Sequence, residues 1–541
     1  MKRLFGSEYK NIYLTILFSI IFIVGVFSYK DYGVSSDEPN SRLKGMVTAN
    51  YLGQIFAPTI TNNYKKKFSL ETNKKYDKID QLHDSGKIKY YGVVFEFPAF
   101  LLERILKVNE KHKQYQLKHF LTFLVFFISL VSFYKLLNLR FQNWIIAVLG
   151  VIILLLTPRI FANSFYNNKD LIFLSFFIFS IHSSFIFIER LNFKSLLFSA
   201  LFCALAIDIR ILGIVTPMIL LMTLAMKQFF YQKQNKIFFK LILQFIFFLS
   251  LFVIVFWPHL WSNPISNFLE AFNVMSKYPL ETYNFFMGEY VLSTQLPKSY
   301  LFIWILITTP ALYILFFIIG LFIFFINFIK KKRERYSHNF FKDFFCLSIL
   351  FSVFFVISYF ESTLYNGWRQ LYFLNIIIVY FSIFGIFELY YLINKNYKKY
   401  FVALLLCSLI FISNWMIINH PHQYVYFNFL AGKKFDKKFE MDYWGLSYKQ
   451  NLEFLLKNEK EETFKIFNLS TNKIFYHSLI IPDIDRKKLH FVDNPLEANY
   501  LITNYLYTQK PKYKFSENDF IILNDIVVDG VSINTLYKRI K

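Results

Sequence analysis

Cysteine is scarce in this sequence, and none lies in a polar segment. Cys203, Cys346 and Cys407 each fall inside an apolar run of the 541-residue chain. Neither a disulfide framework nor a cysteine metal site is therefore predicted. The glycine-rich fingerprints of P-loop and Rossmann nucleotide sites are missing as well. We expect chemistry that does not need a bound nucleotide.

Acidic residues are also in short supply. The chain has 36 Asp and Glu against 60 Lys and Arg, which gives a formal charge of +24. In a soluble protein this excess would suggest nucleic acid. Here 55% of the residues are hydrophobic and long uncharged runs recur, which is typical of an integral membrane protein. Basic cytoplasmic loops and anionic lipid headgroups account for the charge, so no nucleic-acid partner is expected.

The apolar runs predict about eleven membrane-spanning helices. No small-residue cleavage site follows the first run, so we expect it to remain as a helix. No internal repeat is evident, which counts against inverted-repeat secondary transporters. The stretch 195–226 is predicted as two short helices with a turn at its IDIR segment. The expected spans are 12–28, 119–137, 143–158, 171–188, 195–209, 211–226, 238–257, 301–327, 344–360, 371–393 and 400–418.

Short basic loops alternate along the chain in a way that predicts a cytoplasmic N-terminus. The other loops, and the tail from Asn419 onward, then face outward. We expect residues 1–418 to form a membrane domain, with a first outer loop at about 29–118 that contains a lysine-rich insert at 62–81. This topology predicts a protein that is integral to a membrane and contacts membrane lipids.

The tail, 419–541, has short apolar runs bounded by polar residues, which predict a small extracytoplasmic α/β domain. Two outer segments, 37–56 and 265–278, are spaced as helices that lie along the membrane surface. The expected elements of the tail are a helix at 448–460 and strands at 465–469, 489–493, 498–505 and 519–528.

Ionisable side chains gather at the predicted outer mouths of the helices. A mixture of acids and bases there suits a site that holds an anion while a carboxylate removes a proton. Each residue also has a structural interpretation, namely a solvated loop, an ion pair or an interfacial anchor; Asp208 and Arg210, for example, can pair with one another or with a neighbouring helix. The set comprises Asp37, Glu38, Glu96, Arg159, Lys169, Asp170, Asp208, Arg210, His259 and Arg369.

Several of these segments resemble a known family. The acidic motif SSDEP directly follows the first span, and TPRIFANSFYNNKD ends in a second acid. These two segments are similar to segments of the GT-C superfamily of membrane glycosyltransferases. Six further segments share this similarity: AIDIRILG, WPHLWSNPISNFLEAF, GEYVLSTQLPKSYLFIWILITTP, YNGWRQLYF, HPHQYVYFNFLAG and FEMDYWGLSY. The resemblance covers about residues 12–450 and is strongest to the family 39 type, which includes protein O-mannosyltransferases and lipid A aminoarabinose transferases. Asn167–Asn168 departs from the Asn–Pro expected there.

The resemblance favours a bacterial inner membrane as the location. It implies a sugar donor carried on polyprenyl phosphate and a glycan, lipid or protein acceptor with a hydroxyl on the outer face. Transfer would proceed with inversion, with Asp37 of the Asp37–Glu38 pair as the general base. Asp170 would be the second catalytic acid. Arg159, Lys169, Arg210 and Arg369 would neutralise the phosphate, and Glu96 and His259 would contact substrate. Some relatives use a divalent metal and others do not, so a metal stays possible and no other cofactor is expected.

Two other classes remain open from the residues. A polysaccharide polymerase, ligase or flippase that uses lipid-linked substrates is also polytopic with charged outer loops, but needs no acidic pair after the first helix. A secondary transporter would place its ionisable residues near the bilayer midplane, whereas here they cluster at one face.

Overall fold

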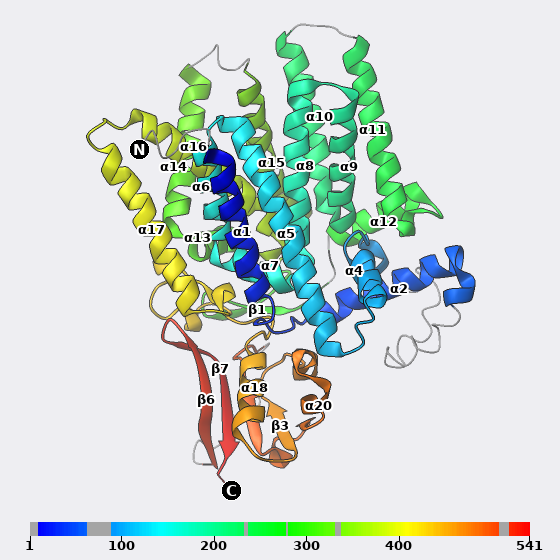
Figure 1. Cartoon of the computed structure of the whole chain (residues 1–541), viewed down its shortest axis with the longest axis vertical. Helices are drawn as coiled ribbons and strands as arrows, with labels where there is room; N and C mark the ends of the chain where they lie inside the picture. The colour runs from blue at the N-terminus through cyan, green and yellow to red at the C-terminus, as the bar shows by residue number, and fades with distance from the viewer. Residues whose placement is uncertain are drawn as a thin grey trace.

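The computed structural model of this chain is a helical bundle with a small sheet domain at one end (Figure 1). It describes residues 9–61, 88–231, 236–276, 278, 280–330, 337–507 and 519–540. The lysine-rich insert expected at 62–81 lies outside the described residues.

The expected spans occur as helices, with the exception of the one at 301–327, and the number long enough to cross a membrane is smaller than eleven. Within the described residues, nine helices are long and apolar enough, or ten if α6 (Trp144–Leu155) and the short α7 (Pro158–Tyr166), which meet at a bend of 69°, form one span. The helix α9 (Phe193–Ile209) has only 17 residues and is shorter than all nine. The bundle consists of α1 (Lys10–Ser28), α5 (Lys111–Phe141), α6 (Trp144–Leu155), α8 (Asp170–Arg190), α9 (Phe193–Ile209), α10 (Val215–Tyr231), α11 (Lys236–Phe256), α14 (Ala311–Lys330), α15 (His338–Phe360), α16 (Asn375–Leu392) and α17 (Lys398–Ile418).

The span expected at 301–327 is broken. It forms α13 (Tyr300–Thr308) and α14, with Pro310 between them. Proline lacks the N–H that a helix interior needs and pushes the preceding residue out of the helical region. Thr309 is accordingly extended, with φ −102° and ψ 140°. A continuous helix over this stretch was the wrong prediction.

The break expected near IDIR is confirmed. The helix α9 ends at Ile209, Arg210 is extended, and a 3₁₀ turn (Ile211–Ile214) leads into α10. Because the chain reverses at Arg210, this side chain lies at the end of the bundle next to the sheet domain.

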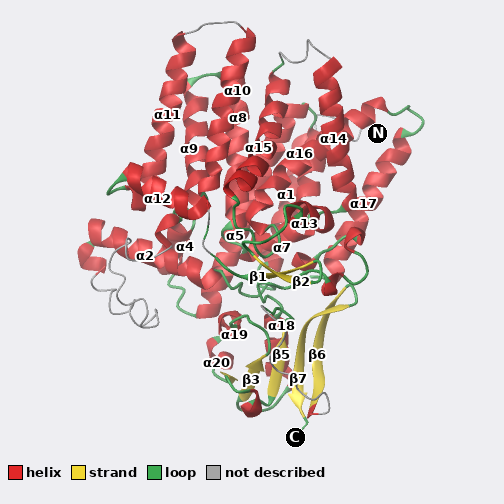
Figure 2. Ribbon diagram, turned by 180° about the vertical axis from the view of Figure 1, so that it is seen from behind, coloured by secondary structure: helices red, strands yellow, loops and turns green. Residues whose placement is uncertain are grey.

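Short elements gather at that same end of the bundle: the β1–β2 hairpin lies between the long helices and the sheet domain, whereas α2, α4 and α12 lie to one side (Figure 2). The outer segment 265–278, expected to be helical, is confirmed as α12, and the segment 37–56 is confirmed as α2. The hairpin β1–β2 was not predicted. These elements are α2 (Glu38–Phe56), α4 (Glu96–Ile105), α12 (Pro264–Ser276), β1 (Tyr283–Phe286) and β2 (Glu289–Leu292).

The tail forms a five-stranded mixed sheet in the order β4-β3-β5-β7-β6. The strands β3 and β5 pair in parallel, whereas β5, β7 and β6 pair antiparallel. All four expected strands and the helix are present, and β7 was missed. The elements are α18 (Tyr448–Asn458), β3 (Phe464–Asn468), β4 (Leu489–Phe491), β5 (Tyr500–Thr503), β6 (Phe520–Val528) and β7 (Val531–Arg539).

The segment after α1 is held between the bundle and the sheet domain. Val34 belongs to the hydrophobic core of the sheet domain, and its carbonyl oxygen lies 2.8 Å from Nδ1 of His477. At Gly33 a Cβ atom would lie 2.5 Å from the carbonyl oxygen of Leu446, so only glycine allows this close approach. The tail therefore fixes the position of the acidic motif that follows.

The division of the chain at residue 418 stays a prediction. The stretch that follows α17 packs on the bundle, since Tyr424, Phe427 and Trp444 belong to the same hydrophobic core as the helices.

Candidate functional site

A cavity of about 660 Å³ opens between the bundle end and the sheet domain. Asp37 precedes the first residue of α2 and makes no capping hydrogen bond with its side chain, so the carboxylate is available to the cavity. The lining comes from the first outer loop, the bundle and the tail. It includes Asp37, Asn40, Ser41, Lys44, Tyr91, Lys169, Tyr278, Tyr365, Arg369, Glu440, Tyr443, Trp444, Asn472 and Tyr507.

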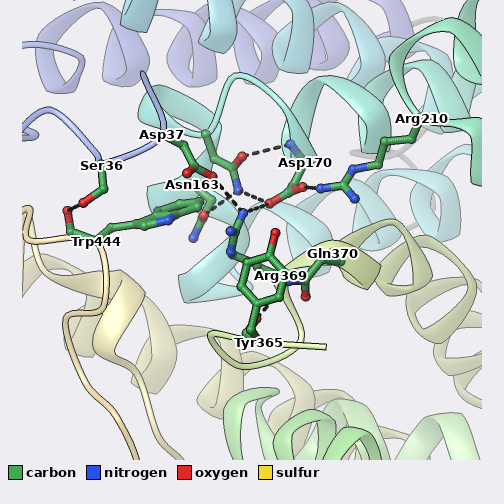
Figure 3. A network of polar contacts seen from close by, with 10 residues as sticks. Ser36, Asp37, Asn163, Asp170, Arg210, Tyr365, Arg369, Gln370 and Trp444 are labelled. Carbon is green, nitrogen blue, oxygen red and sulfur yellow. Dashed lines mark hydrogen bonds and ion pairs between the residues drawn. The ribbon is translucent and has the colours of Figure 1, made fainter. Parts of the chain in front are cut away.

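A chain of alternating charges begins at the lining of this cavity (Figure 3). Asp37 and Arg369 line the cavity, whereas Asp170 and Arg210 are not among its lining residues. Arg369 Nη1 lies 3.1 Å from Asp37 Oδ2 and 3.1 Å from Asp170 Oδ2. Asp170 Oδ1 accepts a hydrogen bond from Arg210 Nη2. Two carboxylates and two guanidiniums from four separate segments of the chain are thus linked in one network.

The carboxylates of the network differ in exposure to solvent. The side chains of Asp170 and Arg369 are 1% and 3% exposed, whereas that of Asp37 is 40% exposed. Arg369 is also stacked on Tyr365 and Trp444, each 4.9 Å from its guanidinium carbon. Asp37 is therefore the accessible carboxylate, and Asp170 is the internal counter-charge that holds the arginines in place.

Nearby cations control the ionisation of Asp37. Its partial burial raises the pKa of the carboxyl group, but the charges of Arg369, Lys169 and Arg210 outweigh that effect, so the pKa lies below its ordinary value. Asp37 is consequently ionised at neutral pH.

Lys169 immediately precedes α8 and also faces the cavity. Its ammonium lies 3.6 Å from the ring centroid of Tyr91. Burial and, next, the charge of Arg210 lower its pKa to about 7. A bound anion would favour the charged form of this lysine.

Asparagines at the junction of α7 and α8 position Asp170. Asn167 Nδ2 donates to Asp170 Oδ2 at 3.1 Å, and the Asp170 N–H donates to Asn167 Oδ1 at 2.8 Å. Asn168, which stands where the resemblance expects proline, donates from its amide to Glu96. Asn168, which replaces the expected proline, therefore contacts the first outer loop.

Two acids expected at the site point elsewhere. Glu38 is fully buried; His119 Nε2 lies 2.9 Å from its Oε1, and the Ser35 N–H donates to its Oε2 at 2.6 Å. Glu96 is 2.7 Å from Lys118 Nζ. Neither residue lines the cavity, and both join the first outer loop to α5 instead.

Arg159, His259 and Asp208 also lie outside the cavity lining. Arg159 donates to the carbonyl oxygen of Tyr426 at 3.1 Å. The His259 ring is packed edge-on against Tyr90 at 5.9 Å. Asp208 accepts backbone N–H groups from the first outer loop and does not pair with Arg210, whose partner Asp170 is on the neighbouring helix α8.

An apolar groove of about 350 Å³ adjoins the polar cavity. Arg210 lines this groove, and three tyrosines line both spaces. The groove runs between the 3₁₀ turn at 211–214, α10, α12 and α15. Its apolar lining includes Ile211, Val215, Met218, Phe272, Met275, Val356, Phe360 and Leu371, and the shared tyrosines are Tyr91, Tyr278 and Tyr365.

Several lining residues were not predicted from the sequence. Aromatic residues such as Tyr91 and Tyr365 are common in a chain with 21% aromatics, so none stood out. Glu440 and Trp444 lie in FEMDYWGLSY, a segment that carried the resemblance but was given no role. Within the described ranges, no group of three or more His, Cys, Asp or Glu side chains gathers to hold a metal ion.

Comparisons with known proteins give a family match for part of the chain. Residues 97–261 match the model of the dolichyl-phosphate-mannose-protein mannosyltransferase family. No curated protein matches the sequence.

Solved structures of an archaeal oligosaccharyltransferase and of ArnT are similar at low identity. An oligosaccharyltransferase of Archaeoglobus fulgidus, in its apo form, has a TM-score of 0.44 and 10% identity, over 76% of this chain and 57% of that one. The archaeal enzyme with an inhibitory peptide and a dolichol-phosphate has a TM-score of 0.42 and 11% identity, over 77% and 61%. ArnT of Cupriavidus metallidurans, bound to undecaprenyl phosphate, has a TM-score of 0.36 and 8% identity, over 83% of this chain and 88% of that one.

The chain spans less than two thirds of the length of the archaeal enzymes. The sequence motifs and the family match over residues 97–261 agree with one another, and the resemblance of this chain to the GT-C superfamily of membrane glycosyltransferases is thereby confirmed.

Proposed function

We propose that this protein transfers a sugar from a polyprenyl-phosphate carrier to a hydroxyl acceptor, with inversion at the anomeric carbon. One observation carries the proposal. An accessible carboxylate, Asp37, lies 3.1 Å from Arg369 in a polar cavity, and an apolar groove lined by Arg210 opens beside that cavity. The arrangement suits a substrate with a polar sugar, an anionic phosphate and an apolar chain.

Each part of the donor has a matching surface. The polyprenyl chain would occupy the groove between α10, α12 and α15, where burial of its apolar surface stabilises the complex. The phosphate would lie near Arg210, Lys169 and Arg369, which supply charge-assisted hydrogen bonds. The sugar would then extend into the polar cavity toward Asp37.

Donor binding would also prepare the base. In the empty site the three cations hold the pKa of Asp37 below its ordinary value, which makes it a weak base. A phosphate shares those cations, so the carboxylate becomes more basic when the donor is present. Asp37 then removes the acceptor proton while the acceptor oxygen attacks the anomeric carbon, and the bond to the phosphate oxygen breaks. Asp170 keeps Arg369 and Arg210 in place.

The proposal includes an orientation of the protein in the membrane. The cavity lies at the end of the bundle that carries the sheet domain, and we assign that end to the extracytoplasmic face, as the distribution of basic loops predicts. Glu38, Glu96, Arg159 and His259 are assigned no contact with the substrate, because other partners or packing contacts hold them away from the cavity.

A donor panel tests the proposed activity. Purified protein in lipid nanodiscs is given radiolabelled sugars on polyprenyl phosphate or on nucleotides, with an envelope extract as acceptor. We expect transfer from at least one polyprenyl-phosphate sugar and none from nucleotide sugars. Transfer from nucleotide sugars alone would contradict the proposal, and transfer only from lipid-linked oligosaccharides would favour a polymerase or ligase.

The pH dependence of donor use should report the ionisation of Lys169. Its pKa of about 7 means that the side chain is charged below pH 7 and loses its charge as the pH rises through 7. Because kcat/KM reports groups of the free enzyme, kcat/KM for the donor should fall between pH 6.5 and 8.5. Lys169→Arg keeps a fixed charge and should flatten this fall. The same decline in the variant would show that another group is responsible.

A further inference from the structure

A second cavity, of about 540 Å³, adjoins the first on the side of the tail. We call it the tail cavity. It lies between the β1–β2 hairpin, the loop 433–442 and the sheet domain. Glu440, Leu506 and Tyr507 line both cavities, so the two spaces are adjacent. Its lining includes Phe285, Tyr290, Lys433, Lys434, Asp436, Lys437, Glu440, Asp442, Tyr505 and Tyr507.

Aromatic rings and lysines dominate the walls of the tail cavity. Phe285 and Tyr290 lie on the hairpin with ring centroids 5.0 Å apart, and two further tyrosines from the sheet domain line the cavity. Three exposed lysines, Lys433, Lys434 and Lys437, line it from the loop 433–442.

The acidic residues of the tail cavity offset little of that positive charge. Asp442 is buried and already accepts the N–H groups of Leu446 and Ser447 at 3.0 Å each and the Ser447 hydroxyl at 2.5 Å. Burial raises the pKa of Glu440 to about 8, so its carboxyl group is largely neutral at pH 7. Among the lining residues that the structure describes, Asp436 is then the one acid that opposes the three lysines directly, and the cavity favours an anionic ligand.

Glu440 marks the junction of the two cavities. The residue is 5% exposed, and its Oε1 finds no hydrogen-bond partner among the residues that the structure describes. A buried polar atom normally has a partner. A neutral carboxyl group at this point can hydrogen-bond a hydroxyl of a ligand that threads from the tail cavity toward Asp37.

We propose that the tail cavity binds the acceptor, and that this acceptor is a glycan chain bearing carboxylate or phosphate groups. Its reactive hydroxyl would extend past Glu440 to Asp37, and the rest of the chain would lie on the aromatic rings with its anionic groups at the lysines. This inference rests on the proposed transferase function and adds the acceptor class to it.

The chemistry of the walls favours a glycan over an acidic peptide. Sugar rings present C–H faces that pack on aromatic rings and hydroxyls that meet tyrosine and carboxyl groups, and both kinds of surface are present here. The lysines are point charges on flexible stems rather than the planar, bidentate arginines that fix a peptide carboxylate in one geometry. Such a wall tolerates anionic groups at varied positions along a chain.

A binding experiment that needs no catalysis tests the inference. The full-length protein in nanodiscs is titrated with fluorescent oligogalacturonate, a phosphorylated mannan oligomer, neutral maltoheptaose and an oligoglutamate peptide. We expect salt-sensitive binding of one or both acidic glycans, which also tells carboxylate from phosphate recognition. Equal binding of maltoheptaose, tighter binding of the peptide, or no binding of any probe would overturn the inference.

Matched variants place the binding in the tail cavity. The triple variant K433Q/K434Q/K437Q should bind the acidic glycan about tenfold more weakly, as expected for the loss of three partly solvated charge contacts. The control K457Q/K465Q/K487Q removes three exposed lysines elsewhere on the tail and should bind normally. An equal loss in both variants would overturn the site assignment.

The role of Glu440 has its own readout. In the transfer assay, Glu440→Leu should raise the acceptor KM about tenfold, since a hydrogen bond at a buried site is lost, while the donor KM stays unchanged. Glu440→Gln keeps a hydrogen-bonding group and should restore the acceptor KM. An unchanged acceptor KM in Glu440→Leu would overturn this role.

The failure of the proposed function and the failure of this inference give different results. If the donor panel gives no transfer although the glycan binds, the proposed function fails while the binding site stands.

Discussion

Replacing Asp37 by asparagine should lower the rate of sugar transfer by about 10²–10⁴-fold, the range by which a general base accelerates a reaction. Asparagine preserves the volume of the side chain but cannot accept the acceptor proton. Folding should be little affected, because Asp37 is 40% exposed and Arg369 keeps its ion pair with Asp170. The measurement is single-turnover transfer at saturating donor, with thermal unfolding of the same samples.

Asp31→Asn is the matched control for this substitution. Asp31 lies six residues earlier in the same outer segment, pairs with His420 at 2.8 Å and is 47% exposed. It does not line the cavity that contains Asp37. The control should transfer sugar at close to the wild-type rate. Near-normal transfer by Asp37→Asn would show that another group takes the proton.

Removing the buried carboxylate Asp170 should have the largest effect on stability. Asp170→Ala leaves the guanidiniums of Arg210 and Arg369 at the bundle end without their shared partner, and breaking a buried ion pair in this way costs about 3–5 kcal/mol. Arg369 would also turn fully toward Asp37, so transfer should fall as well. The free energy of unfolding is measured by denaturant titration in mixed micelles.

Asp483→Ala provides the comparison for Asp170→Ala. Asp483 pairs with Arg486 at 2.9 Å on the surface of the sheet domain and is 44% exposed. An exposed pair contributes about 0–1 kcal/mol, so this variant should unfold almost like the wild type. Similar losses in both variants would contradict the view that Asp170 is the internal counter-charge of the site.

The membrane helices were predictable because a long apolar run is stable in a bilayer as a helix. A chain without water around it must satisfy its backbone hydrogen bonds within each helix. The exceptions have local causes that a count of apolar residues overlooks. Pro310 divides one expected span, and α9 is only 17 residues long.

Which charged residues face the cavity could not be predicted from their position along the chain. Asp37 and Glu38 are adjacent, but successive side chains at the start of a helix point about 100° apart. One therefore faces the cavity and the other meets His119. Arg159 and Lys169 lie in the same short connection, yet only Lys169 reaches the cavity, because Arg159 is held by the carbonyl oxygen of Tyr426, far away in sequence.

The contribution of the tail to the site was also hidden from the sequence. Strands β3 to β6 show clear apolar runs, whereas β7 mixes polar and apolar residues because parts of it are only half-buried. Residues such as Asn472 and Tyr507 reach the cavity through the docking of the whole sheet domain on the bundle end. Local patterns do not report contacts of that kind.

The anomeric configuration of the transferred sugar is the most direct test of the account. The product made from a polyprenyl-phosphate sugar of known configuration is isolated, and its new glycosidic bond is assigned by NMR. A single displacement with Asp37 as base predicts inversion. Retention would contradict the account, because it requires a covalent glycosyl-enzyme intermediate on a carboxylate. The absence of product from every polyprenyl-phosphate donor would contradict it as well.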